Sequence, residues 1–369
     1  MSSKHNLLAC YMCGCTLQDA TLSAEHVIPN ALGGRWKSSE LLCRACNSTC
    51  GARIDAALAR EIGVTMNLLS LERASGDVQN APVMLSSGEQ LLRDIRGNMW
   101  LRHALVREET QGNQIAVEVR GGRRRDVHRA IQGLARKYPG KIDVDAWITK
   151  MNETRTLAVN TTHFTFKGVG SNDSLRSIAK IAANVFVLNG GAREEITRAA
   201  SYIRGDHADH TTRWYYTSDP FKSRDARWVT HAVALRVDAE SRSLWAYVEL
   251  FRVFRYAVRL STEFSGPLAS EDYVYELCNQ IRLDVPRLDF DPRGLDVADG
   301  GVNMTALQAE LSHLTRLAEE RSLEVALAEV VNSAFEAALA RGPNATMHEL
   351  LPGMMEEIDP ILRAIARRR

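Results

Sequence analysis

Six of the seven cysteines in this chain of 369 residues stand within its first fifty residues. Four of them form two Cys-x-x-Cys pairs, Cys10 with Cys13 and Cys43 with Cys46. Two thiolates three residues apart can converge on one ion, and two such pairs complete the tetrahedral shell that zinc prefers. Because the chain shows no signal-peptide pattern, clustered cysteines indicate metal binding rather than disulfides. We therefore predict a zinc site at these four residues.

Two further cysteines leave alternatives open for the ligand set. Cys15 could compete with Cys13, and Cys50 lies four residues beyond Cys46 on the same helical face. The paired spacings favour the Cys-x-x-Cys pairs over buried free cysteines, which are the other interpretation. Four thiolates leave no open position on the ion, so the zinc is expected to be structural. Catalysis must then come from other residues.

The segment LSAEHVIPNALGG, residues 22–34, lies between the two cysteine pairs, and Asn47 follows the second pair. From about Cys10 to Leu58 the chain resembles the HNH endonucleases, the ββα-metal nucleases. In that family two Cys-x-x-Cys pairs enclose an acidic-His-x-x-Pro segment with a Gly-Gly, and Cys-Asn opens a helix. The matching residues, in the order of the family, are Glu25, His26, Pro29, Gly33, Gly34 and Asn47.

This resemblance implies a catalytic site. His26 would be the general base, since an imidazole that titrates near neutrality can deprotonate a water molecule. Glu25 and Asn47 would offer oxygen ligands to one catalytic Mg²⁺ or Mn²⁺ ion bound to the scissile phosphate. Glu25 is one methylene longer than the aspartate common in the family, and the middle asparagine of H-N-H falls at Ser38. A weakened nuclease is therefore an alternative.

The elements that must position these residues follow from hydrophobic periodicity. A helix is expected from about Leu42 to Ile62. The resemblance to the HNH endonucleases further implies two strands that hold His26. Further strands are expected at residues 113–122 and 162–170, the first followed by an amphipathic helix, and a buried helix at 174–189 should end at Gly190. Three aromatic and β-branched stretches, residues 228–237, 243–250 and 251–260, predict an antiparallel meander packed on that helix.

The expected fold class is α+β in three parts. Residues 1–62 would form the zinc-stapled ββα-metal module, and residues 63–295 an α+β region with the meander for target recognition or regulation. Residues 296–369 would form a helical C-terminal region. One face of its first helix carries leucines that could form a homodimer seam or pack within the chain. These leucines are Leu307, Leu311, Leu314 and Leu317.

Charge indicates where a polyanion could bind. The formal net charge is only +1, so a basic surface must be local. Residues 119–141 carry eight basic side chains against Asp126, eight minus one, or +7. Within this stretch Arg123, Arg124, Arg125 and Arg129 are the candidates for contacts with phosphates. A solvated basic face is the alternative.

Two weaker patterns have plain explanations. The stretch GDHADH, residues 205–210, resembles a metal site, but polar loops collect such residues without function. Trp214, Tyr215 and Tyr216 could stack on bases, although aromatic residues before a sheet more often belong to its core.

The sequence as a whole predicts a metal-dependent endonuclease that hydrolyses DNA, with restriction or anti-phage defence as the role associated with this architecture. A nucleic-acid-binding or sensor protein that uses the zinc module as a scaffold is one alternative, and an RNA-cutting nuclease is another. Apolar runs fall short of the roughly 20 residues of a membrane span. We therefore expect a cytoplasmic protein with nucleic acid as partner and no membrane contact.

Overall fold

The structure, a computed structural model, divides into two compact units. It describes residues 9–111, 114–152, 162–163, 170–207, 212–267, 272–293, 295 and 303–340, with positions 346, 348, 351–352, 355 and 359. Unit 1 comprises Met1–Val78 with Phe166–Glu319, and unit 2 comprises Gln79–Thr165 with Glu320–Arg369. This division differs from the three ranges expected from the sequence, because the N-terminal module and the meander share unit 1. The mixture of helices and strands confirms the α+β class.

The N-terminal module begins with two very short paired strands. In β1 (Glu25–His26) and β2 (Lys37–Ser38) Glu25 lies opposite Ser38 in antiparallel register. A single 3-10 turn, η1 (Asn30–Leu32), follows β1. The Gly-Gly then has a steric reason: Gly33 has a φ of 85°, and a Cβ on Gly34 would collide with the carbonyl oxygen of Ile28. The two glycines let the chain reverse tightly behind β1.

The helix expected at Leu42–Ile62 is present but is not regular. It starts as α1 (Arg44–Cys50), passes through a π-helical turn, η2 (Gly51–Asp55), and continues as α2 (Ala56–Ile62). A short helix, α3 (Val64–Leu68), follows. A π-turn carries one more residue per turn than an α-helix, and such turns are frequent at functional sites. This one contains Asp55.

The meander is confirmed as the centre of a six-stranded antiparallel sheet in unit 1. Its order is β14-β13-β10-β11-β12-β9. The strands are β9 (Thr212–Trp214), β10 (Thr230–Asp238), β11 (Ser243–Leu250), β12 (Phe254–Ser261), β13 (Tyr273–Glu276) and β14 (Ile281–Arg282). Every residue of β11 is buried. The sheet therefore has both faces covered, which explains its aromatic and β-branched composition.

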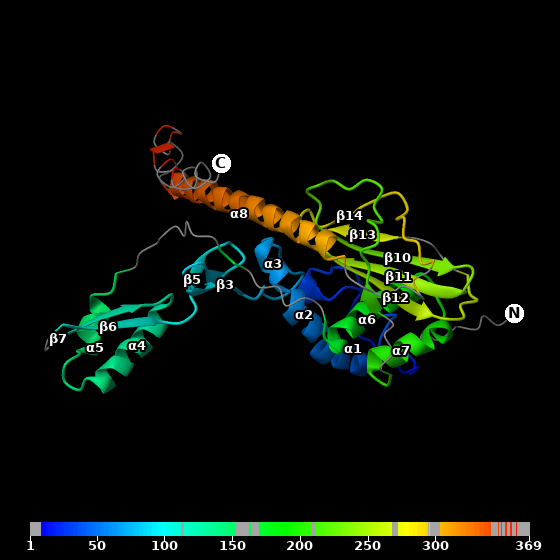
Figure 1. The fold of residues 1–369 in the computed structure, drawn as a ribbon, viewed down its shortest axis with the longest axis horizontal. Coiled ribbons are helices and arrows are strands. Elements are labelled where there is room, and N and C mark those ends of the chain that lie inside the picture. The colour runs from blue at the N-terminus through cyan, green and yellow to red at the C-terminus, as the bar shows by residue number, and fades with distance from the viewer. Residues whose placement is uncertain are drawn as a thin grey trace. The chain divides into compact units, whose positions relative to one another are not determined.

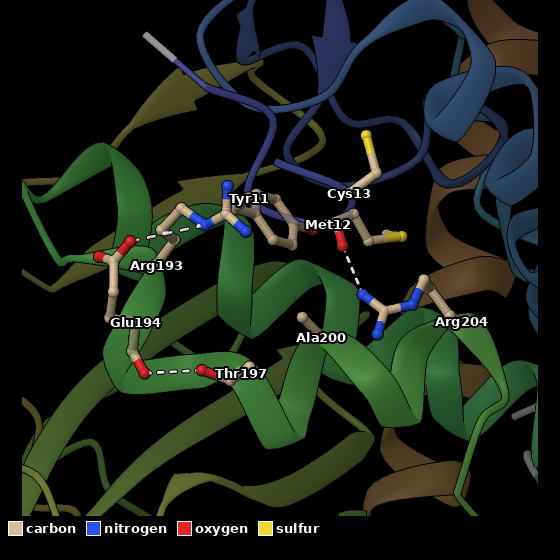
Figure 2. A pocket seen from close by; sticks show the side chains of 8 residues that line it. All are labelled: Tyr11, Met12, Cys13, Arg193, Glu194, Thr197, Ala200 and Arg204. Carbon is tan, nitrogen blue, oxygen red and sulfur yellow. Dashed lines mark hydrogen bonds and ion pairs between the residues drawn. The ribbon is translucent and has the colours of Figure 1, made fainter. Parts of the chain in front are cut away.

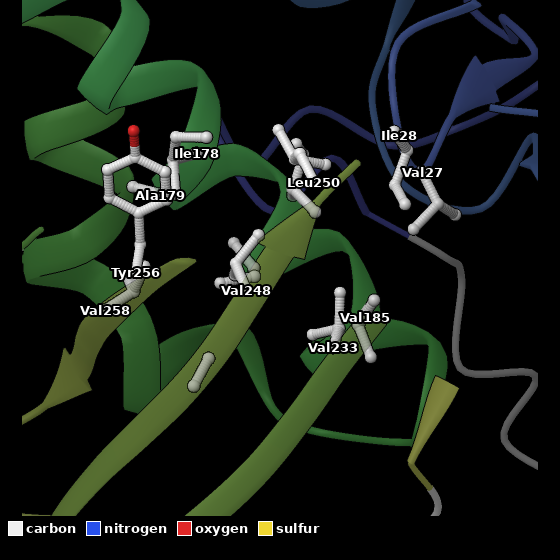
Figure 3. Close-up of a cluster of buried hydrophobic side chains, with 14 of the residues drawn as sticks. Val27, Ile28, Ile178, Ala179, Val185, Val233, Val248, Leu250, Tyr256 and Val258 are labelled. Atoms are coloured by element: carbon white, nitrogen blue, oxygen red, sulfur yellow. The ribbon is translucent and has the colours of Figure 1, made fainter. Parts of the chain in front are cut away.

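Two helices cover one face of this sheet (Figure 1). They are α6 (Asn172–Leu188), the expected buried helix, and α7 (Thr197–Arg204), which follows the 3-10 turn η3 (Arg193–Ile196). Apolar side chains of α6, the sheet and the N-terminal module form one core, as Figure 3 shows with Val185 of α6, Val233 of β10 and Val27 beside β1. The module thus completes its hydrophobic core with residues far along the chain.

Unit 2 contains smaller sheets and a basic helix. Its four-stranded sheet has the order β5-β4-β3-β8, and a separate hairpin pairs β6 with β7. The elements are β3 (Ala81–Leu85), β4 (Gln90–Arg93), β5 (Met99–Leu101), β6 (Leu105–Gln111), β7 (Gln114–Arg120), α4 (Arg124–Lys137), α5 (Val144–Thr149) and β8 (Thr162–His163). The predicted strand at 113–122 and the amphipathic helix after it are present. Of the strand predicted at 162–170, residues 164–169 lie outside the described residues.

The leucine face of the C-terminal helix, α8 (Met304–Ala340), packs within the chain. Leu314 and Leu317 are buried in the core of unit 1, and Leu307 and Leu311 pack against it half-buried. These leucines are therefore not an exposed dimer seam. No helix in the described part of the chain is long and apolar enough to cross a membrane.

The aromatic residues before the sheet belong mainly to its core. Tyr215 is 3% and Tyr216 is 6% exposed. The ring of Trp214 lies 4.7 Å from that of Tyr256, between centroids. Contact with neighbouring rings and strands therefore accounts for these side chains without a role in base stacking.

Candidate active site and zinc site

The four predicted cysteines converge on one point. The Sγ atoms of Cys10, Cys13, Cys43 and Cys46 all lie within 4.8 Å of one another. The first knuckle turns tightly because the amide of Gly14, whose φ is 78°, donates to the carbonyl of Cys10 at 2.8 Å. Four converging thiolate donors are the ligand set of a structural zinc, so these residues fit the ion.

The other two N-terminal cysteines are not among these four, although the thiol of Cys15 lies within hydrogen-bond reach of the thiols of Cys13 and Cys43. Cys50 is buried, with its Sγ atom 3.9 Å from the Sδ atom of Met12. Cys15 donates no ligand to the group, although its carbonyl accepts from the amide of Cys10 at 2.9 Å. Burial acts to raise the pKa of Cys13, but hydrogen bonds from the backbone of Cys15 and from neighbouring thiols lower it to about 6. The thiolate, which is the form that binds metal, is therefore favoured at Cys13.

A surface hollow of 410 Å³ lies beside the first knuckle (Figure 2). The guanidinium of Arg204 donates to the carbonyl of Met12. The guanidinium of Arg193 packs so closely against Gly14 that it leaves no room for a Cβ atom there, and it pairs with Glu194 at 3.7 Å. A zinc with four thiolates carries net negative charge. The two arginines lie next to the knuckle, although each is also paired with a carboxylate, Arg193 with Glu194 and Arg204 with Asp206.

The proposed general base lies on β1 with its ring half-buried. The Nε2 atom of His26 is enclosed and has no hydrogen-bond partner among the described residues. Burial, with the positive charges of Lys37 and Lys180, lowers the pKa of His26. The imidazole is therefore neutral at neutral pH, and a neutral imidazole can accept a proton.

Glu25 points to the opposite side of β1, into the protein. Its side chain is 4% exposed, and its Oε1 atom accepts from the ammonium of Lys180 on α6. The side-chain amide of Asn184 approaches the same oxygen at 3.4 Å. A Mg²⁺ ion keeps several waters and needs access to substrate oxygens. An enclosed carboxylate already paired with an ammonium does not fit an open ligand for that ion.

Asn47 and Ser38 are both tied to local backbone or side-chain groups. Asn47, on α1, is half-buried and its amide donates to Ser23 Oγ at 2.9 Å, on the loop before β1. Ser38 lies opposite Glu25 and its Oγ accepts from the amide of Glu40 at 3.1 Å. Serine thus holds the turn behind β2 through a backbone contact.

Several residues beside the site were not found from the sequence. Lys180 is fully buried, and its ammonium lies 3.0 Å from the carboxylate of Asp55 in the π-turn. The buried imidazole of His231 on β10 donates from Nε2 to the carbonyl of Leu32 at 2.8 Å and accepts from the amide of Phe251 at Nδ1. A charged residue inside the apolar run IAKIAANVFV was the available signal for Lys180, because a lysine at such a position requires a partner.

The predicted phosphate-contacting arginines lie on and before α4 in unit 2. Arg124, Arg125 and Arg129 are exposed, and Arg123 is half-buried with its guanidinium 5.3 Å from the ring centre of Trp100. The exposed three present cationic groups to solvent.

The GDHADH stretch is only partly described. Asp206 pairs with Arg204 at 2.8 Å, whereas Asp209 and His210 lie outside the described residues. In the described part of the chain, no group besides the four cysteines is arranged to hold a metal ion.

The fold and the site define a zinc-stapled module of the ββα-metal kind. Residues 10–62 match the family described as HNH endonuclease, which confirms the resemblance for this segment. This segment is therefore similar to an HNH endonuclease module, and four of its cysteines are placed to hold one metal ion. No curated protein and no solved structure matches the chain.

Proposed function

We propose that this chain is an endonuclease that hydrolyses phosphodiester bonds and that its substrate is DNA. The observation that carries the proposal is His26, half-exposed on β1 with an enclosed Nε2 atom that lacks a partner among the described residues, inside the segment that matches the HNH family. His26 would accept a proton from a water molecule as its oxygen attacks phosphorus and the bond to the leaving oxygen breaks.

The proposal includes a requirement for Mg²⁺ or Mn²⁺, which rests on the family resemblance. Asn47 would be a ligand of such an ion on the family pattern. Glu25 does not fit one, since its carboxylate is enclosed with Lys180. We therefore assign no step of the reaction to the ion.

Substrate binding would use the cationic side chains of Arg123, Arg124, Arg125 and Arg129. Arginines contact phosphates without reading sequence, so this surface would give affinity rather than specificity. A role in cytoplasmic restriction or anti-phage defence is the biological part of the proposal, and it rests on architecture alone.

The test is cleavage by the purified full-length protein. Supercoiled plasmid, single-stranded DNA and RNA are incubated with Mg²⁺, Mn²⁺ or EDTA. We expect plasmid nicking or linearisation that EDTA abolishes, and a loss of roughly 10²–10⁴-fold in rate for His26→Ala. The matched control is His103→Ala, at an exposed histidine of unit 2, which should cut as the wild type does. Equal rates for His26→Ala and wild type, or cleavage in EDTA, contradict the mechanism.

A second candidate function is a nucleic-acid-binding or sensor protein that uses the zinc module as a scaffold. The enclosure of Glu25 with Lys180 favours it, because a lost metal ligand would leave a binding module. Tight binding of DNA or RNA without cleavage of any substrate supports this function. Cleavage of RNA but not of DNA instead identifies an RNA-cutting nuclease.

A further inference from the structure

Three charged groups from distant parts of the chain meet inside unit 1. The ammonium of Lys180 contacts the carboxylate of Glu25 and lies 3.0 Å from Asp55 Oδ2. The exposed fractions of the side chains of Lys180, Glu25 and Asp55 are 0%, 4% and 14%, respectively. Asp55 is held from its other oxygen by the hydroxyl of Ser177, one turn before Lys180, at 2.6 Å. Lys180 thus stands between two carboxylates that approach from the module.

The charge state of this cluster follows from its burial. Burial alone would lower the pKa of Lys180, but the nearby carboxylates of Asp55 and Glu25 raise it above its ordinary value. The lysine is therefore an ammonium. A buried carboxylate without a positive partner is strongly destabilising, so removing the ammonium would leave two of them uncompensated.

The same helix also fixes the backbone of the catalytic strand. The side-chain amide of Asn184, one turn after Lys180, donates to the carbonyl of Val27 at 3.3 Å and lies 3.5 Å from that of His26. The Oδ1 atom of Asn184 accepts from the hydroxyl of Tyr11 at 2.8 Å, next to the zinc knuckle. Contacts from α6 therefore reach the side chain before His26, the backbone after it and the zinc knuckle.

We infer that Lys180 is the resident cation of the Glu25 site, where it replaces a divalent metal ion as the partner of that carboxylate and acts as a positioning residue for β1. The inference rests on the proposed function in that it assigns roles at the same site. Glu25 then holds β1 against α6 and so fixes the backbone that carries His26, whose half-buried ring lies on the opposite side of the strand.

The experiment measures Mn²⁺ binding and thermal unfolding of the full-length, zinc-loaded protein without nucleic acid. The variants are Glu25→Gln, Lys180→Met, Lys180→Arg and the double variant Glu25→Gln/Lys180→Met. Methionine matches the unbranched shape of lysine and removes the charge. Glu72→Gln and Lys141→Met, at exposed positions, are the matched controls.

We expect Glu25→Gln to lower the unfolding temperature and to leave Mn²⁺ binding within about twofold of wild type, well under the tenfold loss typical of a disturbed metal site. Lys180→Met should be less stable still and should gain one Mn²⁺ site, because Glu25 and Asp55 then face each other without a cation. The double variant should be more stable than the sum of the two single changes predicts. Lys180→Arg should keep a positive charge and gain no Mn²⁺ site.

The inference is overturned if Glu25→Gln weakens Mn²⁺ binding at least tenfold at an unchanged unfolding temperature, since Glu25 would then be a metal ligand. A folded Lys180→Met that gains no Mn²⁺ site also overturns it. If Lys180→Met does not fold, Glu25→Gln alone tests the inference. A lower unfolding temperature with unchanged Mn²⁺ binding supports it, and Mn²⁺ binding weakened at least tenfold at an unchanged unfolding temperature overturns it. None of these measurements needs cleavage of a substrate. A protein without nuclease activity would therefore contradict the proposed function, whereas the role of Lys180 would still be tested by Mn²⁺ binding and thermal unfolding.

Discussion

Two histidines of unit 1 have lowered pKa values and different surroundings. His26 is half-buried with a free Nε2 atom among described residues, whereas both ring nitrogens of His231 are engaged inside the core. His231 donates to the carbonyl of Leu32 and accepts from the amide of Phe251, which fixes it as the neutral tautomer with the proton on Nε2. A free, neutral nitrogen suits a base, and a fully bonded one suits a structural link between β10 and η1.

This difference predicts a pH dependence of stability from His231. Burial lowers its pKa to about 4 from an ordinary 6.5, so the unfolded state takes up the proton first as pH falls. Its contribution is therefore fully present above about pH 6.5 and is lost towards pH 4, up to about 3 kcal/mol. Urea unfolding at pH 7.0 and 4.5 measures this loss. The slope of stability against pH should be shallower in His231→Gln, and an equal slope in both proteins contradicts the assignment.

At the residue scale, the spacing of residues in the sequence predicted the part of the site that depends only on residues close together in the chain. The four cysteines were identified because a knuckle needs two thiolates three residues apart, and they converge as expected. The assignments of His26, Glu25 and Asn47 came from the family pattern and stay proposals. The partner of Glu25 was not predictable by spacing, since Lys180 lies 155 residues further along the chain and only the tertiary fold brings it close.

At the scale of elements, the N-terminal module consists of pieces too short to be stable alone. Its strands have two residues each, and α1 has seven. Isolated helices and hairpins of this size are marginal in water. The two cysteine pairs join the loop at residues 10–13 to the start of α1, so a bound zinc would substitute for secondary structure that the module lacks.

We therefore expect cysteine variants to separate ligands from bystanders. Cys43→Ser should lose the stoichiometric zinc and lower the unfolding temperature, because structural zinc sites contribute folding free energy directly. Cys15→Ser, in the same segment but outside the ligand group, should keep the zinc. Elemental analysis of the purified proteins with thermal unfolding measures both effects. Loss of zinc from Cys15→Ser and its retention in Cys43→Ser would contradict the assigned ligands.

The basic helix α4 leads to a prediction about salt dependence. Replacing the exposed Arg124, Arg125 and Arg129 together by alanine should weaken DNA binding equally across sequences. The slope of log affinity against log salt should become shallower by about 0.9 for each phosphate that is no longer neutralised. Fluorescence anisotropy at several salt concentrations measures this slope. The control is Lys222→Ala, at an exposed lysine of unit 1, which should leave the slope unchanged. If the triple variant also leaves the slope unchanged, these arginines do not contact DNA phosphates.

Elements with a strong internal period were predicted well. The meander and α6 stand out by their β-branched and apolar runs, and both are present. The strands between residues 81 and 111 were not predicted. In β3 the exposed alternate residues are Pro82 and Met84, which are apolar, so the alternate burial of the strand does not appear as an apolar–polar alternation in the sequence. The π-turn was also missed, since no local pattern marks one added residue in a helix.

At the scale of the whole molecule, unit 1 is assembled from two separate stretches of chain. The HNH module of residues 10–62 shares its hydrophobic core with α6 and the six-stranded sheet. Such non-local packing carries no signature in either stretch, so the sequence predicted a separate domain at 1–62 that the structure does not isolate. The family match likewise covers only that first stretch.

We expect residues 1–78 expressed alone to be poorly folded even with zinc. Val27, Ile28 and Leu32 would lack the apolar cover that α6 and the sheet provide, and Glu25 would lack Lys180. The amide resonances of the fragment should then be poorly dispersed in a proton–nitrogen correlation spectrum, in contrast to the full-length protein. A well-dispersed spectrum with one bound zinc would show instead that the module folds autonomously.

The π-turn at Gly51–Asp55 changes the direction in which the residues after it point around the helix axis, relative to the residues before it. Each residue of an α-helix turns the chain by about 100°, so the turn determines the direction in which Asp55 and all of α2 face relative to Cys43 and Cys46. A deletion of one residue that regularised this helix would keep every zinc ligand and every residue type at the site. It would nevertheless rotate Asp55 away from Lys180. The length of this segment is therefore as much a part of the site as its chemistry.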